Sequence, residues 1–389
     1  MKKTYTYKNA AVETFVFDNG NEVKEAHVMI HATDPTAPFS RQLSAMAEAL
    51  NSLSANELKD FHPVFKRYFV SDAANQEDEV RREERATPDP SLGRGDVPGA
   101  RNEECAVSII EQPPLDGTKV AMWCYLMTDV KTSQLESGLY CAKCGSYRHL
   151  WGGSAHNLAA NSEYQTQMLF DDYIKQLEKE GCTLKDNCIR TWFFVNDIDL
   201  NYGGVVRARN RTFFTQGLTN DTHFIASTGI GGRQADPNVL TQMDTYAISG
   251  ISPSQVKHLY APTHLNRTSD YGVSFERGTM IDYCDRRHVF ISGTASIDNL
   301  GQIVHPKDIV RQTDRMIENV EALLKEAECG FDNVGQMIVY LRDISDYAVV
   351  SRTIRHRFPD IPKIIVHAPV CRPGWLIEME CIAICKSTS

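Results

Sequence analysis

The feature that most constrains this chain is a pattern that occurs three times along it. Each copy reads as a strand pair, a helix, a strand, a second helix and two closing strands. In each copy the middle strand ends in an aromatic, an apolar, a polar, an aspartate and an apolar residue, at Phe69–Ala73, Phe194–Ile198 and Tyr340–Ile344. A period of this length predicts three copies of one α+β unit, each needing a partner surface to cover the apolar face of its sheet. Three similar units in one chain can close into a ring with approximate threefold symmetry.

We therefore expect a first unit at residues 1–130, a second at 140–250 and a third at 255–389. The first opens with a hairpin whose strands run from Tyr5 to Phe17 and from Val23 to Ala32. The second opens at Tyr147, with a helix over 162–180 and a shorter helix over 205–214. The third has the clearest amphipathic helix, with an apolar face formed by Ile309, Thr313, Met316, Val320, Leu323 and Ala327.

Composition narrows the class of protein. The chain has 389 residues, 42% of them hydrophobic and 23% charged, which is typical of a globular protein. A net charge of −9 disfavours nucleic-acid binding through bulk electrostatics but leaves room for a basic pocket that holds a small anionic metabolite. No apolar run approaches the eighteen or so residues of a membrane span, so we expect no membrane association and a cytoplasmic location.

The eleven cysteines have no tight framework, and this indicates reduced thiols. Cys141 and Cys144 form half a zinc motif, but Cys182 and Cys188 are a poor second pair, so we expect no metal site.

The stretch from Ile361 to Cys385 predicts two strands around a turn at Pro369, Pro373 and Gly374. Its second strand carries Glu378 among apolar neighbours. A carboxylate there is costly to ionise, so its pKa should rise and it can serve as a general acid or base. The alternative is a strand residue that faces solvent.

Aligning the closing strands of the three units distinguishes these alternatives. The position of Glu378 falls on Gln242 in the second unit and on about Ala121 in the first. A structural role favours interchangeable residues. A single acid among three degenerate copies instead favours one retained site.

The third unit resembles the Rid (YjgF) superfamily. The resemblance lies in SGTASID at 292–298, Gln312 and Asn319 on the helix, YLRDISDY at 340–347, and the closing stretch 362–384. Members of that family are small homotrimers with ligand sites in the clefts between subunits. The resemblance therefore implies a single-chain pseudo-trimer that acts as a monomer.

Residues 189–385 resemble a narrower branch, the chorismatases, which are fused Rid-like domains. The matching pieces are Arg190–Trp192, Arg209–Phe213, Thr228–Gly231, Ser254–Val256, Tyr271–Arg277, Ser292–Ile297 and Val370–Arg372. The resemblance implies an enzyme that cleaves the enolpyruvyl ether of chorismate, or of a related unsaturated carboxylate, to pyruvate and a hydroxybenzoate. No cofactor is required.

That chemistry needs a proton at the enol carbon, cations for the carboxylates and a dry pocket. Glu378 is the expected acid, and the resemblance implies that Cys371 belongs to the chorismatases that form 3-hydroxybenzoate. The expected substrate-binding residues are Arg372, Arg277, Arg209, Arg190, Tyr271, Ser274 and Lys363.

Several alternatives stay open. Lys363 stands where Rid proteins carry a carboxylate-binding arginine, and lysine lacks the bidentate geometry. This disfavours an imine or enamine deaminase without excluding it, and a metabolite-binding protein without turnover is the other possibility. Arginines on helices are usually solvated, and without the resemblance Cys371 is more typical of a small buried residue than of a catalytic one. The sequence assigns no role to the first unit, the Thr87–Arg101 loop or the Cys141/Cys144 pair.

Overall fold

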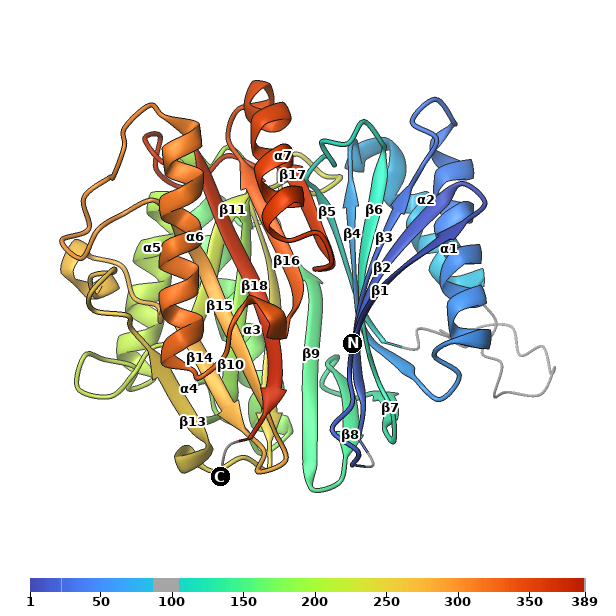
Figure 1. The fold of residues 1–389 in the computed structure, drawn as a ribbon. Coiled ribbons are helices and arrows are strands. Elements are labelled where there is room, and N and C mark those ends of the chain that lie inside the picture. Colours follow the sequence, from blue (N-terminus) through green and yellow to red (C-terminus); the bar gives the residue numbers. More distant parts are fainter. Residues whose placement is uncertain (22, 87–104, 388–389) are drawn as a thin grey trace.

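The computed structural model describes residues 1–21, 23–86 and 105–387, with the side chain of Tyr271 also left out, so the Thr87–Arg101 loop lies outside the described residues. It contains three six-stranded sheets with helices on their outer faces (Figure 1). The first unit comprises β1 Lys2–Tyr7, β2 Ala10–Phe17, β3 Glu25–Ala32, α1 Phe39–Asn56, β4 His62–Val70, α2 Ala73–Ala86, β5 Ala106–Glu111 and β6 Val120–Met127.

The second and third units follow the same plan. The second comprises β7 Lys131–Gln134, β8 Tyr140–Cys144, β9 Tyr147–Ala155, α3 Ser162–Lys179, α4 Leu184–Asn187, β10 Cys188–Val195, α5 Ile198–Thr215, β11 Ala226–Gly231 and β12 Thr241–Ser249. The third comprises β13 Val256–Leu259, β14 Gly278–Asp282, β15 Arg286–Ala295, α6 Ile309–Glu326, β16 Val334–Leu341, α7 Tyr347–Arg357, β17 Lys363–His367 and β18 Ile377–Lys386, with short 3-10 helices at Pro253–Gln255, Thr268–Tyr271, Phe331–Asn333 and Ile344–Asp346.

The strand order is the same in all three sheets and confirms the threefold repeat. Three antiparallel strands are followed by the closing strand, then the middle strand, then an edge strand parallel to it: β1-β2-β3-β6-β4-β5, β7-β8-β9-β12-β10-β11 and β13-β14-β15-β18-β16-β17. The middle strands end at Val70, Val195 and Leu341, within the repeated motif. The α6 face is also as predicted, since Thr313, Met316, Val320 and Leu323 are buried.

The units contact one another in a ring. β5 of the first unit lies along β9 of the second, β11 of the second along β15 of the third, and β16 of the third along β3 of the first. At the second of these contacts the Ser227 amide donates to Ser292 Oγ at 2.9 Å. At the third, a ring nitrogen of His31 lies 3.0 Å from the Lys363 carbonyl oxygen. Each sheet thus has its inner face covered by the other two, while the helices face outward.

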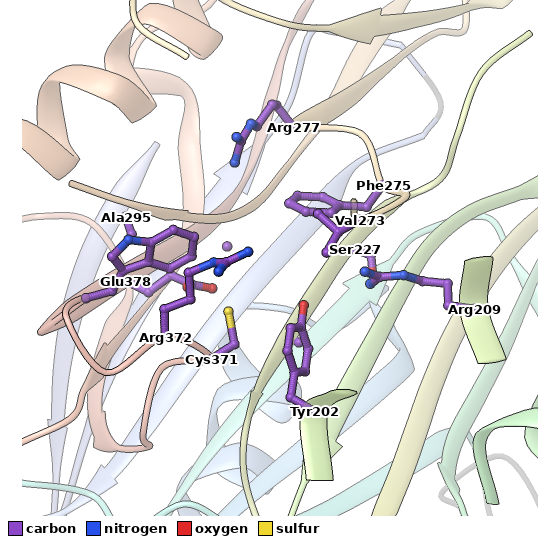
Figure 2. Close-up of a pocket in the computed structure, with 13 residues that line it drawn as sticks. Tyr202, Arg209, Ser227, Val273, Phe275, Arg277, Ala295, Cys371, Arg372 and Glu378 are labelled. Atoms are coloured by element: carbon purple, nitrogen blue, oxygen red, sulfur yellow. The ribbon is translucent and has the colours of Figure 1, made fainter. Parts of the chain in front are cut away.

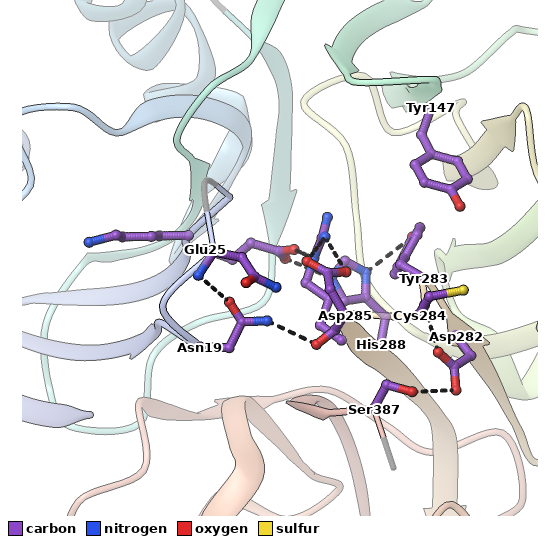
Figure 3. Close-up of polar contacts among 12 residues, drawn as sticks. Asn19, Glu25, Tyr147, Asp282, Tyr283, Cys284, Asp285, His288 and Ser387 are labelled. Carbon is purple, nitrogen blue, oxygen red and sulfur yellow. Dashed lines mark hydrogen bonds and ion pairs between the residues drawn. The ribbon is translucent and has the colours of Figure 1, made fainter. Parts of the chain in front are cut away.

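A buried polar cluster closes the ring between the first and third units (Figure 3). Glu25 is fully buried, accepts from Tyr125 Oη at 2.6 Å, lies 2.6 Å from His288 Nε2 and pairs with Arg286. Burial opposes ionisation of Glu25, but the charges of His288 and Arg286 outweigh it and hold its pKa well below its ordinary value. Asn19 adds a donor to the Asp285 carbonyl at 2.9 Å.

Some predicted elements differ from those observed. Each unit has three strands before its first helix, where a strand pair was expected. In the first unit, the strand predicted from Tyr5 to Phe17 is two strands that turn at Asn9. In the second unit, the sheet begins at Lys131, before the predicted start at Tyr147. The helix expected over 205–214 begins at Ile198. Gly204 lies inside α5, where a Cβ would come 2.2 Å from Ser162 Oγ, so glycine allows α5 to approach α3.

The expectation of reduced thiols throughout is wrong for one pair, since Cys329 and Cys385 form a disulfide across 56 residues. The side chains of Cys141 and Cys144 belong to different hydrophobic clusters on opposite sides of β8, so the two thiols do not converge. No helix in the described part of the chain is long and apolar enough to cross a membrane.

Candidate active site

A pocket between the second and third units collects most of the expected functional residues (Figure 2). β18 contributes Glu378, β15 and β11 form the floor, α5 forms one side, and the turn between β17 and β18 forms the other. The lining residues are Tyr202, Arg209, Ser227, Gly229, Val273, Phe275, Arg277, Gly293, Ala295, Cys371, Arg372, Trp375 and Glu378. The pocket is therefore a cleft between two units, and its two walls come from distant parts of the sequence.

Glu378 is 3% exposed and rests directly on Gly293, where a Cβ would lie 1.8 Å from Glu378 Oε1. Burial raises the pKa of Glu378 to about 8; the charge of Glu380 adds to this, while Arg277 and Arg190 oppose it. Within the described part of the chain its carboxyl makes no hydrogen bond or ion pair. At neutral pH the group is therefore mostly protonated and able to donate a proton into the pocket.

Three arginines line the same pocket as the acid. Arg209 is 1% exposed, and its Nε and Nη2 have no hydrogen-bond partner among the described residues. Arg277 donates to the carbonyl and side-chain oxygens of Asn266 at 3.0–3.3 Å. Arg372 lies 5.6 Å from the Trp375 ring centroid. A buried guanidinium with unused donors is costly unless an anion pairs with it, so Arg209 marks a place for a carboxylate.

Cys371 lies between Glu378 and Tyr202 in Figure 2. Burial, and then the nearby Glu378, raise the pKa of the Cys371 thiol to about 12. The group is therefore a neutral thiol at physiological pH, suited to shaping the pocket or donating a weak hydrogen bond rather than to nucleophilic attack.

Tyr202, Phe275 and Ser227 line the pocket but were not expected from the sequence as site residues. Tyr202 lies on α5, before the predicted start of that helix at Val205. It packs on Gly229, where a Cβ would come 2.7 Å from its ring. The close approach of this ring to β11 is thus what requires glycine in the Thr228–Gly231 segment.

Arg190, Ser274 and Lys363 were expected beside the substrate but do not line the pocket, and the side chain of Tyr271 lies outside the described residues. Arg190 is buried behind the pocket wall and paired with Glu380 at 2.9 Å. Ser274 lies in the same segment as Val273 and Phe275 but is not in contact with the pocket.

Lys363 lies at the contact between the third and first units. Its Nζ is 3.2 Å from Glu13 Oε1 and also donates to the carbonyls of Pro359 and Ile361. Lys363 pairs with Met337 on the middle strand, and the corresponding residue of the second unit, paired with Thr191, is Ser227. The place of Lys363 is therefore occupied in the Glu378 pocket by a serine.

The strand register confirms the alignment of the closing strands. Glu378 pairs with Tyr340, Gln242 with Phe194, and Ala121 with Phe69, which are the same position in the three repeats. Gln242 donates across its cleft to the Ile109 carbonyl at 3.0 Å. This hydrogen bond, and the contact between His31 and the Lys363 carbonyl, cross the other two clefts.

Comparison with known proteins places the third unit in a family. The model of the family described as Endoribonuclease L-PSP matches residues 281–385. A RutC family protein of Pyrococcus abyssi is 38% identical over 98 residues, which cover 24% of this chain and 76% of that protein. The chain belongs to the RutC (Rid) family. Another member, the 2-iminobutanoate/2-iminopropanoate deaminase of Mus musculus, is 31% identical over 101 residues, covering 25% of this chain and 74% of the enzyme.

The fold of this RutC family chain as a whole, including its first and second units, is similar to that of a solved structure. The crystal structure of a chorismatase superposes with a TM-score of 0.62 at 17% identity, covering 83% of this chain and 93% of the other. The arrangement of three Rid-like units in one chain is therefore shared with that protein.

Proposed function

We propose that the Glu378 pocket cleaves the enolpyruvyl ether of chorismate, or of a closely related unsaturated dicarboxylate, by general-acid catalysis. The single observation that carries the proposal is a buried carboxyl with a pKa near 8 that faces a pocket lined by three arginines. An acid that stays protonated at neutral pH suits protonation of an enol ether carbon, and the arginines suit a substrate with two carboxylates.

In this reaction Glu378 donates its proton to the methylene carbon of the enolpyruvyl group. Water then adds to the ether carbon, which carries the positive charge, and gives a proton back to the Glu378 carboxylate. The resulting hemiketal passes its hydroxyl proton to the ring oxygen as the bond between that oxygen and the former ether carbon breaks, and pyruvate is released. If the ring then loses a hydroxyl as water, it becomes a hydroxybenzoate, and water is neither consumed nor produced overall. Arg209, with its unused donors, is the best placed of the cations to hold one carboxylate.

Phe275 and Trp375 supply the apolar walls that this chemistry needs. Both are at most 9% exposed, and they limit the water around the acid. Exclusion of bulk water keeps Glu378 protonated and strengthens each arginine–carboxylate contact.

A deaminase acting on small imines is the second candidate, because similar family members carry that activity in their names. The serine at the Lys363-equivalent place in the pocket disfavours it, since the sequence resemblance assigns an arginine to that place in Rid proteins. A cleft that binds a metabolite without turnover is the third candidate.

The test is incubation of the pure protein with chorismate, with pyruvate and aromatic products quantified for wild type and Glu378→Gln. We expect pyruvate and a hydroxybenzoate from wild type, and loss of both in the variant. A parallel assay measures ammonia release from 2-iminopropanoate. Ammonia without pyruvate from chorismate would support the deaminase instead, and pyruvate release that survives Glu378→Gln would overturn the assignment of the acid.

A further inference from the structure

Two buried charged residues behind the pocket, Arg190 and Glu380, have no part in the proposed chemistry. Glu380 is two residues from Glu378 on β18, so both side chains lie on the same face of the sheet. Arg190 Nη2 donates to Glu380 Oε2 at 2.9 Å, and Trp192 Nε1 donates to Glu380 Oε1 at 2.9 Å. Both charged side chains are at most 3% exposed. A buried ion pair is therefore fixed directly beside the acid.

The same guanidinium is linked to the surface on which Glu378 rests. Arg190 Nη2 donates to Thr228 Oγ1 at 2.5 Å. Thr228 Oγ1 in turn accepts from the Gly293 amide at 2.9 Å. Two hydrogen bonds therefore link Arg190 to Gly293, the residue against which the Glu378 carboxyl packs.

The threefold repeat shows which part of this arrangement is particular to the site. Asp244, the second unit's equivalent of Glu380, also has a buried arginine partner, Arg67 of the first unit, at 2.8 Å. The position of Arg190 is held by Phe65 in the first unit and by Gln336 in the third, as the strand register shows. These two residues stand on the middle strands beside the clefts that contain Gln242 and Ala121. Of the three equivalent positions, the arginine occurs in the one beside the acid.

We infer that Arg190 and Glu380 are positioning residues for Glu378: the contacts through Thr228 and Gly293 fix the carboxyl, and the charge of Glu380 sets its electrostatic environment. The inference rests on the proposed function for its effect on turnover, but its effect on the carboxyl itself can be measured without substrate. The other groups that face Glu378 are Arg277, Arg209, Arg372 and Cys371 from the pocket, and Tyr340 from β16.

The electrostatic consequence has a definite sign. The Glu380 charge disfavours ionisation of Glu378, and the Arg190 charge favours it. Glu380→Gln should therefore lower the titration midpoint of Glu378, by about one pH unit or more. Arg190→Met should raise it, and the double variant, which removes both charges, should lie closer to wild type than either single variant.

The experiment is a pH titration of full-length protein labelled with ¹³C at the glutamate side-chain carboxyls. The Glu378 resonance is assigned by its absence in Glu378→Gln. Glu380→Gln keeps the shape of the side chain and one oxygen that can accept from either Arg190 or Trp192, so it is expected to fold. Lys66→Met is the matched control, because it breaks another buried pair, with Glu84, in the first unit.

The expected result is opposite shifts in the two single variants and no shift in Lys66→Met. Midpoints of Glu380→Gln and Arg190→Met equal to that of wild type would overturn the inference, and so would an equal shift in Lys66→Met. If wild type titrates as expected but does not cleave chorismate, the proposed function fails while the positioning role stands.

Discussion

Substituting Gly293 by alanine tests the geometry of the site with one methyl group. The new Cβ would lie 1.8 Å from Glu378 Oε1 and 3.0 Å from Thr228 Cγ2. Ordinary contact begins near 3.4 Å, so the carboxyl must retreat by about 1.5 Å. Thr228 is held by Arg190 and by the Gly293 amide itself, so the Glu378 side chain is the part that moves.

The expected cost in stability is that of inserting a methylene into a packed interior, about 1–3 kcal/mol. The expected cost in activity is larger, because a displacement of this size at a catalytic group lowers kcat/KM by roughly 100-fold. The assay is pyruvate release from chorismate, with the free energy of unfolding measured by denaturant titration.

Gly330→Ala is the matched control for this substitution. Gly330 has an extended backbone at φ −144° and no atom within 4 Å of an added Cβ, so both activity and stability should be unchanged. A Gly293→Ala protein with kcat/KM within about twofold of wild type would refute the placement of Glu378 at the reacting centre.

Three further predictions concern the scaffold. Burial opposes protonation of His31, but the hydrogen bond with Asp116 and the charges of Glu13 and Asp116 outweigh it, so the pKa of His31 is raised. The contribution of His31 to stability should therefore be present below pH 6.5 and be lost as pH rises through the raised pKa. His31→Gln should abolish that pH dependence in denaturant titrations. Reduction of the Cys329–Cys385 disulfide should lower the free energy of unfolding by about 2–4 kcal/mol. The double variant Cys329→Ser/Cys385→Ser should show the same loss without reductant. Equal stability before and after reduction would argue against the bond. Because the ring closes within one chain, the mass in solution should be that of a monomer, and a stable trimer of chains in sedimentation would contradict it.

The parts of the fold that could be predicted are those with a local signal. The motif at the end of each middle strand revealed the three units, and the alignment of the closing strands gave the correct equivalence of Glu378 with Gln242 and Ala121. The strands at Lys131–Gln134 and Tyr140–Cys144 were not predicted, and the first of them consists of exposed polar residues with no apolar pattern.

The parts of the site that could not be predicted depend on contacts between units. Counting along the chain placed Lys363 beside Glu378, but the pocket lies between two units, so the residue that fills that place is Ser227. Arg190 was expected to meet substrate because its partner Glu380, 190 residues away, leaves no trace in the local sequence. Tyr202 was not predicted because the helix that carries it was expected to begin at Val205, and its place in the pocket depends on packing against Gly229 of β11.

The most direct test of the central claim, that Glu378 is a general acid in a dry cationic pocket, is the pH dependence of kcat/KM for pyruvate release from chorismate. Because the protonated form acts and its pKa is about 8, the rate should be flat near neutrality and fall about tenfold per pH unit above that value. A rate that rises with pH through this range, or that stays constant well above pH 8, would contradict the account.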